Sequence, residues 1–479
     1  MNDRVRIILS LCLLGGLSGC MVGPDYERPL TPVDPNQNHR YTWLPEGWTD
    51  ANDPNAMQQW WTTLGDATIN ELVQDVLTHN TDLRRAAANM RQAEAVLRQV
   101  HGLRWPQVGY GAQAGRSRTG MDLSFLPGGG FTSFYSNSFT HGFNVSYVLD
   151  LFGRLKRSQR AAVRDLQAIE ADREALAHAL VALAIDLRVQ IATAQKLLRI
   201  SEARIVTWER SVEVIERRYE GGLGSPVDLY LAKESLADSR AARSLSWQLI
   251  IINKHALDVM RGRPPQGREE IEDTLPALPP LDPIPLGLPS HLLSRRPDVR
   301  AAELRVAAAT ERIGERTAER YPDLTLGLGF GFGSNDYEKL LDWKYRTLQA
   351  GVQLTAPLFA GGRLKAGVDA ARAEAEGAIE TYVGSVLGAV QEVEDTLVKG
   401  QTFTEQLTHY MDQYQQASEA ERLSTDRYVR GVDTILVVLE SERRRRQAEY
   451  LIATTEGGLW RNRIAIYLSL GGDWGLAGY

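Results

Sequence analysis

The feature that most constrains the fold is a short glycine-rich segment from Asp323 to Gly333. Every second residue in it is a large apolar one, and only threonine or glycine stands between them; the apolar positions are Leu324, Leu326, Leu328, Phe330 and Phe332. This period of two predicts a β-strand with one apolar face and one almost bare face. About ten residues let a tilted strand cross a bilayer, and such faces are typical of outer-membrane barrels. An edge strand of a soluble sandwich gives the same pattern.

Three further segments alternate in the same way and weaken the soluble alternative. Residues 347–355 alternate leucine, alanine and valine with glutamine and glycine, and residues 107–114 and 139–147 do likewise. We therefore expect two hairpins, with strands at about 106–117 and 139–150 and at about 323–334 and 346–358. Four strands cannot close a barrel, and each unpaired backbone group of an open edge would cost several kcal/mol in lipid. Several copies of the chain are thus expected to contribute to one barrel.

The N-terminus has the pattern of a bacterial secretory signal followed by a lipid-attachment site. Arg4 and Arg6 precede a short apolar run, and Leu17-Ser18-Gly19-Cys20 then resembles a lipobox. We expect a signal peptide over residues 1–19, cleavage before Cys20, and N-acyl and S-diacylglycerol lipid on that cysteine; a chance match to small residues at a cleavage site is the alternative. Met21 after the cysteine resembles the pattern of lipoproteins that move on to the outer membrane. The only other cysteine, Cys12, lies in the removed segment, so the mature chain is expected to have no disulfide and no cysteine metal site.

Long helices account for most of the remaining chain. Residues 20–65 are expected to form a lipidated, extended N-terminal segment. A helical pattern follows over residues 69–104 and ends at Trp105-Pro106. The proline-free stretch of residues 155–224 would form a helix roughly 100 Å long at 1.5 Å per residue. A helix of this length, with many alanines at its apolar positions, needs neighbouring helices in a coiled-coil-like assembly.

The chain is duplicated. The order helix, strand, strand, very long helix, returning helix occurs in a first repeat at residues 66–262 and again in a second repeat at residues 290–470. Matched segments include Arg104-Trp105-Pro106 with Arg320-Tyr321-Pro322 and Arg218-Tyr219 with Arg427-Tyr428. A proline-rich linker at residues 263–289 joins the repeats, and residues 471–479 form a C-terminal tail. The fold class we expect is mainly α with a membrane β-barrel.

The start of the mature chain and the duplicated turns together resemble a known family. Cys20 is followed by Met21-Val22-Gly23-Pro24-Asp25-Tyr26, which is similar to the NodT-type lipoproteins of the TolC/OprM outer-membrane factor family, as are the Arg-Tyr-x-x-Gly turns at 218–222 and 427–431. The resemblance implies a homotrimer with a twelve-stranded barrel on an α-helical periplasmic tunnel. It also implies the exit duct of a tripartite efflux pump in the outer membrane, whose partners are a periplasmic adaptor (membrane fusion) protein and an inner-membrane RND-type transporter.

The same resemblance places a gate at the periplasmic tip. Leu436 and Glu440 are four residues apart, on one helical face, where the family has an apolar ring and a carboxylate ring. Three carboxylates at an axis would attract cations and act as a charge filter. Val437 stands where a second acidic ring could be, so a double ring is in doubt; for Val437 and Leu439 we favour ordinary helix packing. Asp433 stands where TolC has a basic partner.

Two more sets of residues follow from the resemblance. Tyr428 and Asp228 match positions that tie neighbouring helices together, so they are expected to form a gate latch. The tips are expected to meet the adaptor; the alternative is a turn with no binding role. The tip residues are Gly222, Leu223, Ser225, Gly431, Val432 and Thr434.

Composition excludes other classes of protein. A formal charge of −6 does not favour nucleic-acid binding, and 43% hydrophobic residues exclude a helical multi-span membrane protein. No histidine spacing, nucleotide loop or nucleophile elbow predicts an enzyme, a metal site or a cofactor. Residues 443–446, four arginines, are interpreted as a solvated or inter-helix salt-bridge face. The rival hypotheses are a periplasm-spanning structural lipoprotein without a pore and a type I secretion duct; the transported substrate is not encoded in any motif.

Overall fold

The computed structural model describes residues 21–31, 60–64, 66–123, 125, 127–128, 130–265 and 296–471. The described chain is mostly helical, as expected. The predictions for residues 1–20, including the signal peptide and the lipid on Cys20, lie outside the described residues. Most of the N-terminal segment, most of the linker and the C-terminal residues 472–479 also lie outside them.

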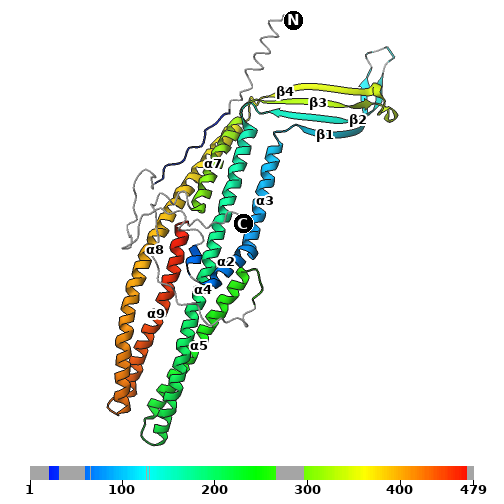
Figure 1. The fold of residues 1–479 in the computed structure, drawn as a ribbon. Coiled ribbons are helices and arrows are strands. Elements are labelled where there is room, and N and C mark those ends of the chain that lie inside the picture. Colours follow the sequence, from blue (N-terminus) through cyan, green and yellow to red (C-terminus); the bar gives the residue numbers. More distant parts are fainter. Residues whose placement is uncertain are drawn as a thin grey trace. The chain divides into compact units, whose positions relative to one another are not determined.

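The element order repeats, as Figure 1 shows. In the first half, 3-10 helix η1 (Trp60–Leu64) and helices α2 (Ala67–His79) and α3 (Thr81–Gly102) precede strands β1 (Gln107–Asp122) and β2 (Phe131–Leu149) and helices α4 (Arg154–Glu220) and α5 (Pro226–Met260). In the second half, α7 (Pro297–Ala318), β3 (Asp323–Ser334), β4 (Arg346–Thr355), α8 (Arg363–Val429) and α9 (Ile435–Ser469) follow in the same order, with short 3-10 helices η3 (Tyr337–Lys339) and η4 (Trp343–Tyr345) between the strands.

The single helix expected over residues 69–104 is wrong, because the chain breaks at Asn80. The ψ angle of Asn80 is 132°, which is extended. Its side-chain oxygen accepts hydrogen bonds from the backbone N–H groups of Asp82 (2.9 Å) and Leu83 (3.2 Å), and its amide donates to the carbonyl of Met260 at 2.9 Å. Asn80 is thus a buried N-cap for α3. The apolar periodicity continues across this residue, so periodicity alone did not reveal the break.

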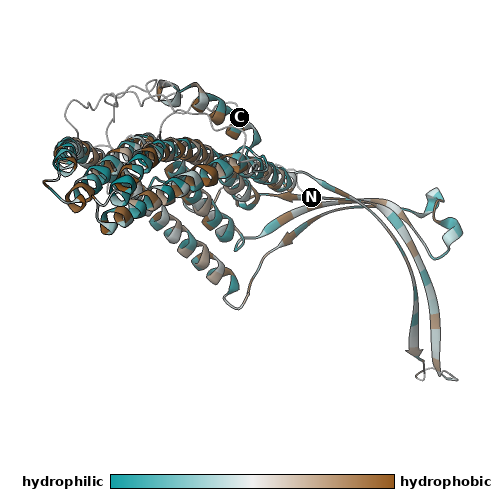
Figure 2. Ribbon diagram, turned by 90° about the horizontal axis from the view of Figure 1, so that it is seen from below, coloured by the Kyte–Doolittle hydropathy of each residue, from teal (hydrophilic) through white to brown (hydrophobic). Residues whose placement is uncertain are grey.

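The four strands form one antiparallel sheet in the order β1-β2-β3-β4. β1 and β2 are longer than predicted, whereas β4 ends three residues before the predicted end. The register aligns the apolar positions of neighbouring strands: Tyr110 faces Phe143, which faces Phe330, which faces Leu348. Apolar and polar segments alternate along the strands in Figure 2. The sheet therefore has one continuous apolar face and one face of glycine and small polar residues.

The chain divides into two compact units. Unit 1 comprises residues 1–29, 90–169 and 302–382 and holds the sheet; unit 2 comprises residues 30–89, 170–301 and 383–479. The division falls inside α3, α4, α7 and α8, so each unit takes segments from both sequence repeats. One stretch of α4 is long and apolar enough to cross a membrane, but most of it is buried among other helices, as in a core helix.

Candidate functional site

Two tight turns in unit 2 join the long helices to the returning ones. In the α4–α5 turn, Gly222 has a φ of +72°, and the N–H of Leu223 donates to the carbonyl of Arg218 at 2.8 Å. In the α8–α9 turn, Gly431 has a φ of +76°, and the N–H of Val432 donates to the carbonyl of Arg427 at 2.9 Å. A left-handed glycine that closes the end of a helix in this way is a common helix C-cap. The duplicated motif thus folds into the same turn twice.

The residues expected to meet an adaptor are all exposed at these turns. Leu223 and Val432 are 77% and 61% exposed, which is unusual for apolar side chains. A Cβ at Gly222 or Gly431 would meet nothing within 4 Å. Of the two residues that precede the returning helices, Ser225 caps α5 through its hydroxyl, whereas Thr434 makes no side-chain cap. Each turn therefore has an exposed glycine, with free space around its backbone, beside one exposed apolar side chain.

An apolar cluster just above the turns holds the two helical hairpins together. Its buried members come from α4, α5 and α9, and Tyr428, Val438 and Leu439 pack against them; the buried members are Trp208, Ile215, Leu229, Ala232 and Ile435. The expectation that Leu439 packs between helices is confirmed. Val437 differs, because its side chain is 47% exposed and does not belong to this cluster.

The proposed latch residues meet across this cluster. The hydroxyl of Tyr428 donates a hydrogen bond to Oδ2 of Asp228 at 3.3 Å, although the residues are 200 positions apart. The guanidinium of Arg218 lies over the Tyr428 ring, 5.6 Å from its centroid. Burial, followed by the charge of Asp228, raises the pKa of Tyr428. The phenol is therefore protonated and available as a donor over the whole ordinary pH range.

Asp433 belongs to a local ion pair. Its carboxylate accepts two hydrogen bonds from Arg427, at 2.6 Å from Nε and 3.2 Å from Nη2. These bonds lower the pKa of Asp433. The pair joins the end of α8 to the turn. Asp433, which stands where a basic residue was expected, is therefore neutralised by Arg427 within the turn.

Of the two expected ring residues, Leu436 is exposed, whereas Glu440 is half-buried and its carboxylate is paired. Leu436 is 59% exposed. Glu440 accepts hydrogen bonds from Arg443 (2.9 and 3.0 Å) and from Arg444 (2.8 Å) on its own helix. The bonds from Arg443, followed by those from Arg444, lower the pKa of Glu440 to about 2. The expectation of an unscreened carboxylate at this position is therefore wrong, because the carboxylate of Glu440 is paired with two guanidinium groups of its own helix.

The other arginines of the run pair between helices, as expected. Arg445 binds Glu421 on α8, and Arg446 binds Asp238 on α5. Sequence reasoning did not find the buried pair beneath them, in which Nε of Arg204 donates to Glu442 at 3.1 Å and both residues are at most 8% exposed. Burial lowers the pKa of Arg204. The only sign of this pair in the sequence was that Arg204 stands at an otherwise apolar position of α4.

The N-terminal residues next to Cys20 are clamped in unit 1. Arg157, only 1% exposed, donates to the carbonyls of Val22 (3.3 Å) and Gly23 (3.2 Å) and to Asp25 (3.2 Å). It also binds Glu311 at 2.7 Å. The N–H of Val22 donates to the carbonyl of Phe152 at 3.2 Å. Two to five residues after Cys20, the chain is therefore already held by a buried arginine.

Close backbone approach completes this clamp. A Cβ on Gly314 would lie 2.7 Å from Nε of Arg157, and a Cβ on Gly23 would lie 2.5 Å from the Cα of Gly314. Only glycine fits at both positions. Farther along, Tyr26 donates to Glu303 at 3.0 Å and Arg28 binds the same carboxylate at 2.8 Å.

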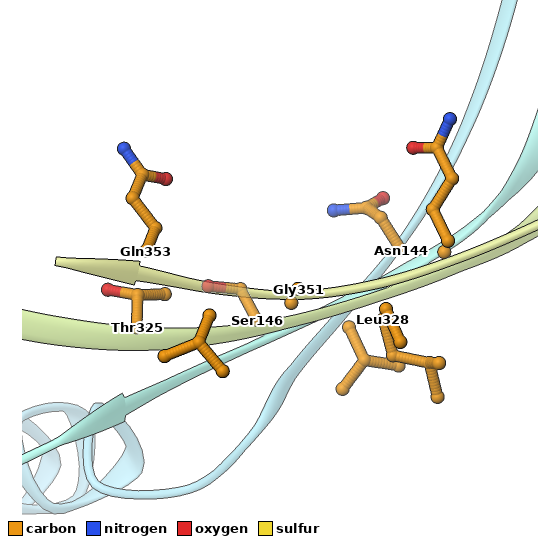
Figure 3. Close-up of a pocket in the computed structure, with 12 residues that line it drawn as sticks. Asn144, Ser146, Thr325, Leu328, Gly351 and Gln353 are labelled. Carbon is orange, nitrogen blue, oxygen red and sulfur yellow. The ribbon is translucent and has the colours of Figure 1, made fainter. Parts of the chain in front are cut away.

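The two faces of the sheet differ in chemistry, and Figure 3 shows this contrast. Asn144, Ser146, Thr325 and Gln353 lie on one side of the strands, whereas Leu328 lies on the other side. Gly327, Gly329 and Gly351 line a pocket at this part of the sheet together with these side chains. Among the described residues no group of three metal-binding side chains occurs.

A two-faced sheet and paired helices of 67 and 35 residues in one chain are typical of a class of protein, the outer-membrane channels with helical extensions. The chain belongs to the outer membrane efflux protein family, whose profile matches residues 72–263 and 288–472. It is an outer-membrane efflux channel and not an enzyme.

Individual relatives cover nearly the whole chain. The toluene efflux pump outer membrane protein TtgF of Pseudomonas putida is 29% identical over 97% of this chain and 96% of its own length. The pyoverdine export outer membrane protein OpmQ, also of Pseudomonas putida, is 30% identical over 90% of this chain and 92% of its own. Among solved structures, the outer-membrane channel OprN has a TM-score of 0.83 at 28% identity and matches 95% of this chain and 100% of its own.

Proposed function

We propose that three copies of this chain form a lipid-anchored exit duct that carries small molecules from an inner-membrane RND-type transporter and a periplasmic adaptor protein to the outside. The observation that carries the proposal is the sheet. Its edge strands, β1 and β4, each have a pairing partner on one side only within the described chain. Four strands from each of three chains would make twelve, and pairing β4 with β1 of the next copy would remove every open edge, as lipid requires.

The proposed barrel turns its apolar face to lipid and its polar face to the lumen. The lumen would then be lined by glutamine, asparagine, threonine and glycine, which let polar solutes pass. The helices α4, α5, α8 and α9 would extend the duct as an α-helical periplasmic tunnel. The exposed turns at their ends, with Leu223 and Val432, would receive the helical ends of the adaptor.

The gate would lie at these turns. Threefold symmetry would place Leu436 at the axis as an apolar ring, with Glu440 and Arg443 on the same helical face. Hydrogen bonds from Tyr428 to Asp228 would hold the hairpins of each copy in one arrangement. Asp433, paired with Arg427, would stabilise the turn. The charges at the axis would then be those of Glu440 and Arg443.

The lipid on Cys20 would anchor each copy in the inner leaflet of the outer membrane. Arg157 supports this role, because it fixes Val22 and Gly23 immediately after the modified residue. The clamp would hold the acyl chains beside the start of the strands. No cofactor or metal is part of the proposed function.

Neighbouring residues of β4 offer a direct test of which face meets lipid. Val352 is on the apolar face and Gln353 on the polar face, and both are exposed in the single chain. An arginine on the lipid face near the middle of a bilayer costs about 2–4 kcal/mol, whereas a lumen residue tolerates charge. We expect Val352→Arg to prevent assembly in the outer membrane and Gln353→Arg to assemble and change the ion selectivity in planar bilayers. Normal assembly of Val352→Arg would contradict the barrel.

A further inference from the structure

The apolar face of the sheet ends on arginines at its two edges. On β1 the apolar positions Val108 to Ala114 are followed on the same face by Arg116 and Arg118. On β4 the apolar positions Leu354 to Leu348 are followed by Arg346. On the central strands a neutral residue stands at the corresponding place of this face: Asn137 follows Phe139 on β2, and Ser334 follows Phe332 on β3. Within the described strands, the arginines that follow the apolar positions of this face therefore lie on the two edge strands.

These three arginines are exposed and have aromatic rather than acidic neighbours. The guanidinium groups of Arg116 and Arg118 lie over the ring of Tyr135, 5.0 and 5.6 Å from its centroid. Arg346 lies 5.0 Å from the centroid of the Trp343 ring and donates to the carbonyl of Trp343 at 2.9 Å. In the described chain none of the three forms an ion pair with a carboxylate. Each guanidinium keeps N–H donors free for an anion.

The depth of Arg116 and Arg118 matches the edge of a bilayer. Trp105, 62% exposed, stands just before β1 at the end of the sheet where the helices connect. Arg116 is eleven residues farther along, about 36 Å at about 3.3 Å per residue. With a tilt of about 35–45°, the rise is about 25–30 Å, close to the apolar band of about 25 Å in outer-membrane barrels. Arg116 and Arg118 therefore lie where the apolar band stops, at the end away from the helices.

We propose that Arg116 and Arg118 of one copy and Arg346 of the next form a site for the phosphate groups of an outer-leaflet glycolipid. This inference rests on the proposed trimeric barrel, because β1 and β4 are the edges that closure would bring together. Each junction between copies would then have one such site, and a single chain holds only half of it.

The chemistry favours a phosphorylated lipid over other occupants. The planar guanidinium binds phosphate oxygens through two parallel hydrogen bonds. Tyr135 and Trp343 are amphipathic rings of the kind that line membrane interfaces, and they hold the guanidinium groups at the surface without neutralising them. The adjoining apolar face would receive the acyl chains of the same molecule. A lipid with an anionic head group fits both halves of this surface.

The test measures lipid binding to the mature, lipidated protein in detergent. After exchange into fresh detergent, the protein is titrated with diphosphorylated lipid A or with the same lipid after removal of its phosphates, and native mass spectrometry counts the lipids bound to each trimer. The variants are Arg116→Gln/Arg118→Gln and Arg346→Gln. The control is Lys339→Gln/Lys344→Gln, which removes two positive charges from the β3–β4 connection, outside the apolar face.

We expect the wild type to bind up to three phosphorylated lipids per trimer, at least tenfold more tightly than the dephosphorylated form. Either arginine variant should weaken this binding at least fivefold, and the lysine control should bind like the wild type. Equal affinity for the two lipids, or equal weakening by the lysine control, would overturn the site while leaving the trimer intact. A protein that is only monomeric would overturn the proposed function as well.

Discussion

Replacing Tyr428 with phenylalanine removes one oxygen atom from the contact that ties the two helical hairpins of a chain together. The phenyl ring keeps its place against the apolar cluster and beneath Arg218, because both contacts involve the ring and not the hydroxyl. Only the hydrogen bond to Asp228 is lost. The variant therefore separates the latch from the packing around it.

The geometry sets the size of the effect. At 3.3 Å, the bond is longer than the usual 2.5–3.0 Å between two oxygens, and the site is only partly buried. We therefore assign it about 1 kcal/mol, below the range for bonds to charged groups. One such bond per chain would change a closed-to-open equilibrium about fivefold, and three that break together would change it by about two orders of magnitude, or about 3 kcal/mol.

Single-channel recording in planar bilayers measures this change. We expect Tyr428→Phe to raise the open probability and mean conductance relative to the wild type. Tyr219 is the matched control, because it occupies the corresponding position of the first repeat, is 43% exposed, and its hydroxyl has no hydrogen-bond partner within the described chain. Tyr219→Phe should record like the wild type. Unchanged currents in Tyr428→Phe would remove the latch from the account.

Three further substitutions test other parts of the account. Gly222→Trp forces a bulky residue into left-handed backbone and covers the open surface of the α4–α5 turn. Drug-susceptibility assays should therefore show lost efflux, while the native mass of the protein remains unchanged. Normal efflux would contradict an adaptor-binding tip. Arg443→Gln should raise the pKa of Glu440 from about 2 towards its ordinary value. Because a lowered pKa keeps the carboxylate charged as the pH falls, the ion selectivity of the variant should change between about pH 5 and 3, whereas that of the wild type should not. A wild type whose selectivity changes over the same range would refute this. Arg157→Met should leave Glu311 without its closest cation and destabilise the fold by about 3 kcal/mol, with faster hydrogen exchange in the N-terminal segment; unchanged exchange would exclude the clamp.

Local patterns in the sequence predicted the elements well, because their periods are set by the backbone. The alternation in residues 323–333 predicted β3 within one residue of its observed end, and the proline-free stretch predicted α4. Asn80 shows where this reasoning fails. Its capping hydrogen bonds break a helix whose apolar periodicity continues, and the bond to Met260 depends on a contact 180 residues away.

The sites depended on contacts that spacing does not encode. Arg157 and Glu311 are 154 residues apart, and Arg204 and Glu442 are 238 apart, so only the folded chain reveals that they pair. The nearness of Tyr428 and Asp228 was expected from a family resemblance and not from the residues themselves. Conversely, the pairing of Glu440 with Arg443 was within reach of the sequence, because the two residues are three positions apart on one helix.

The native mass of the mature protein, extracted in mild detergent, tests the central claim most directly. Both edges of the sheet have backbone groups that lipid cannot satisfy, so we expect a particle of three chains, with twelve strands closed into one barrel. A stable, lipidated monomer that remains folded in detergent would contradict the barrel, and with it the duct, and would favour a structural lipoprotein without a pore.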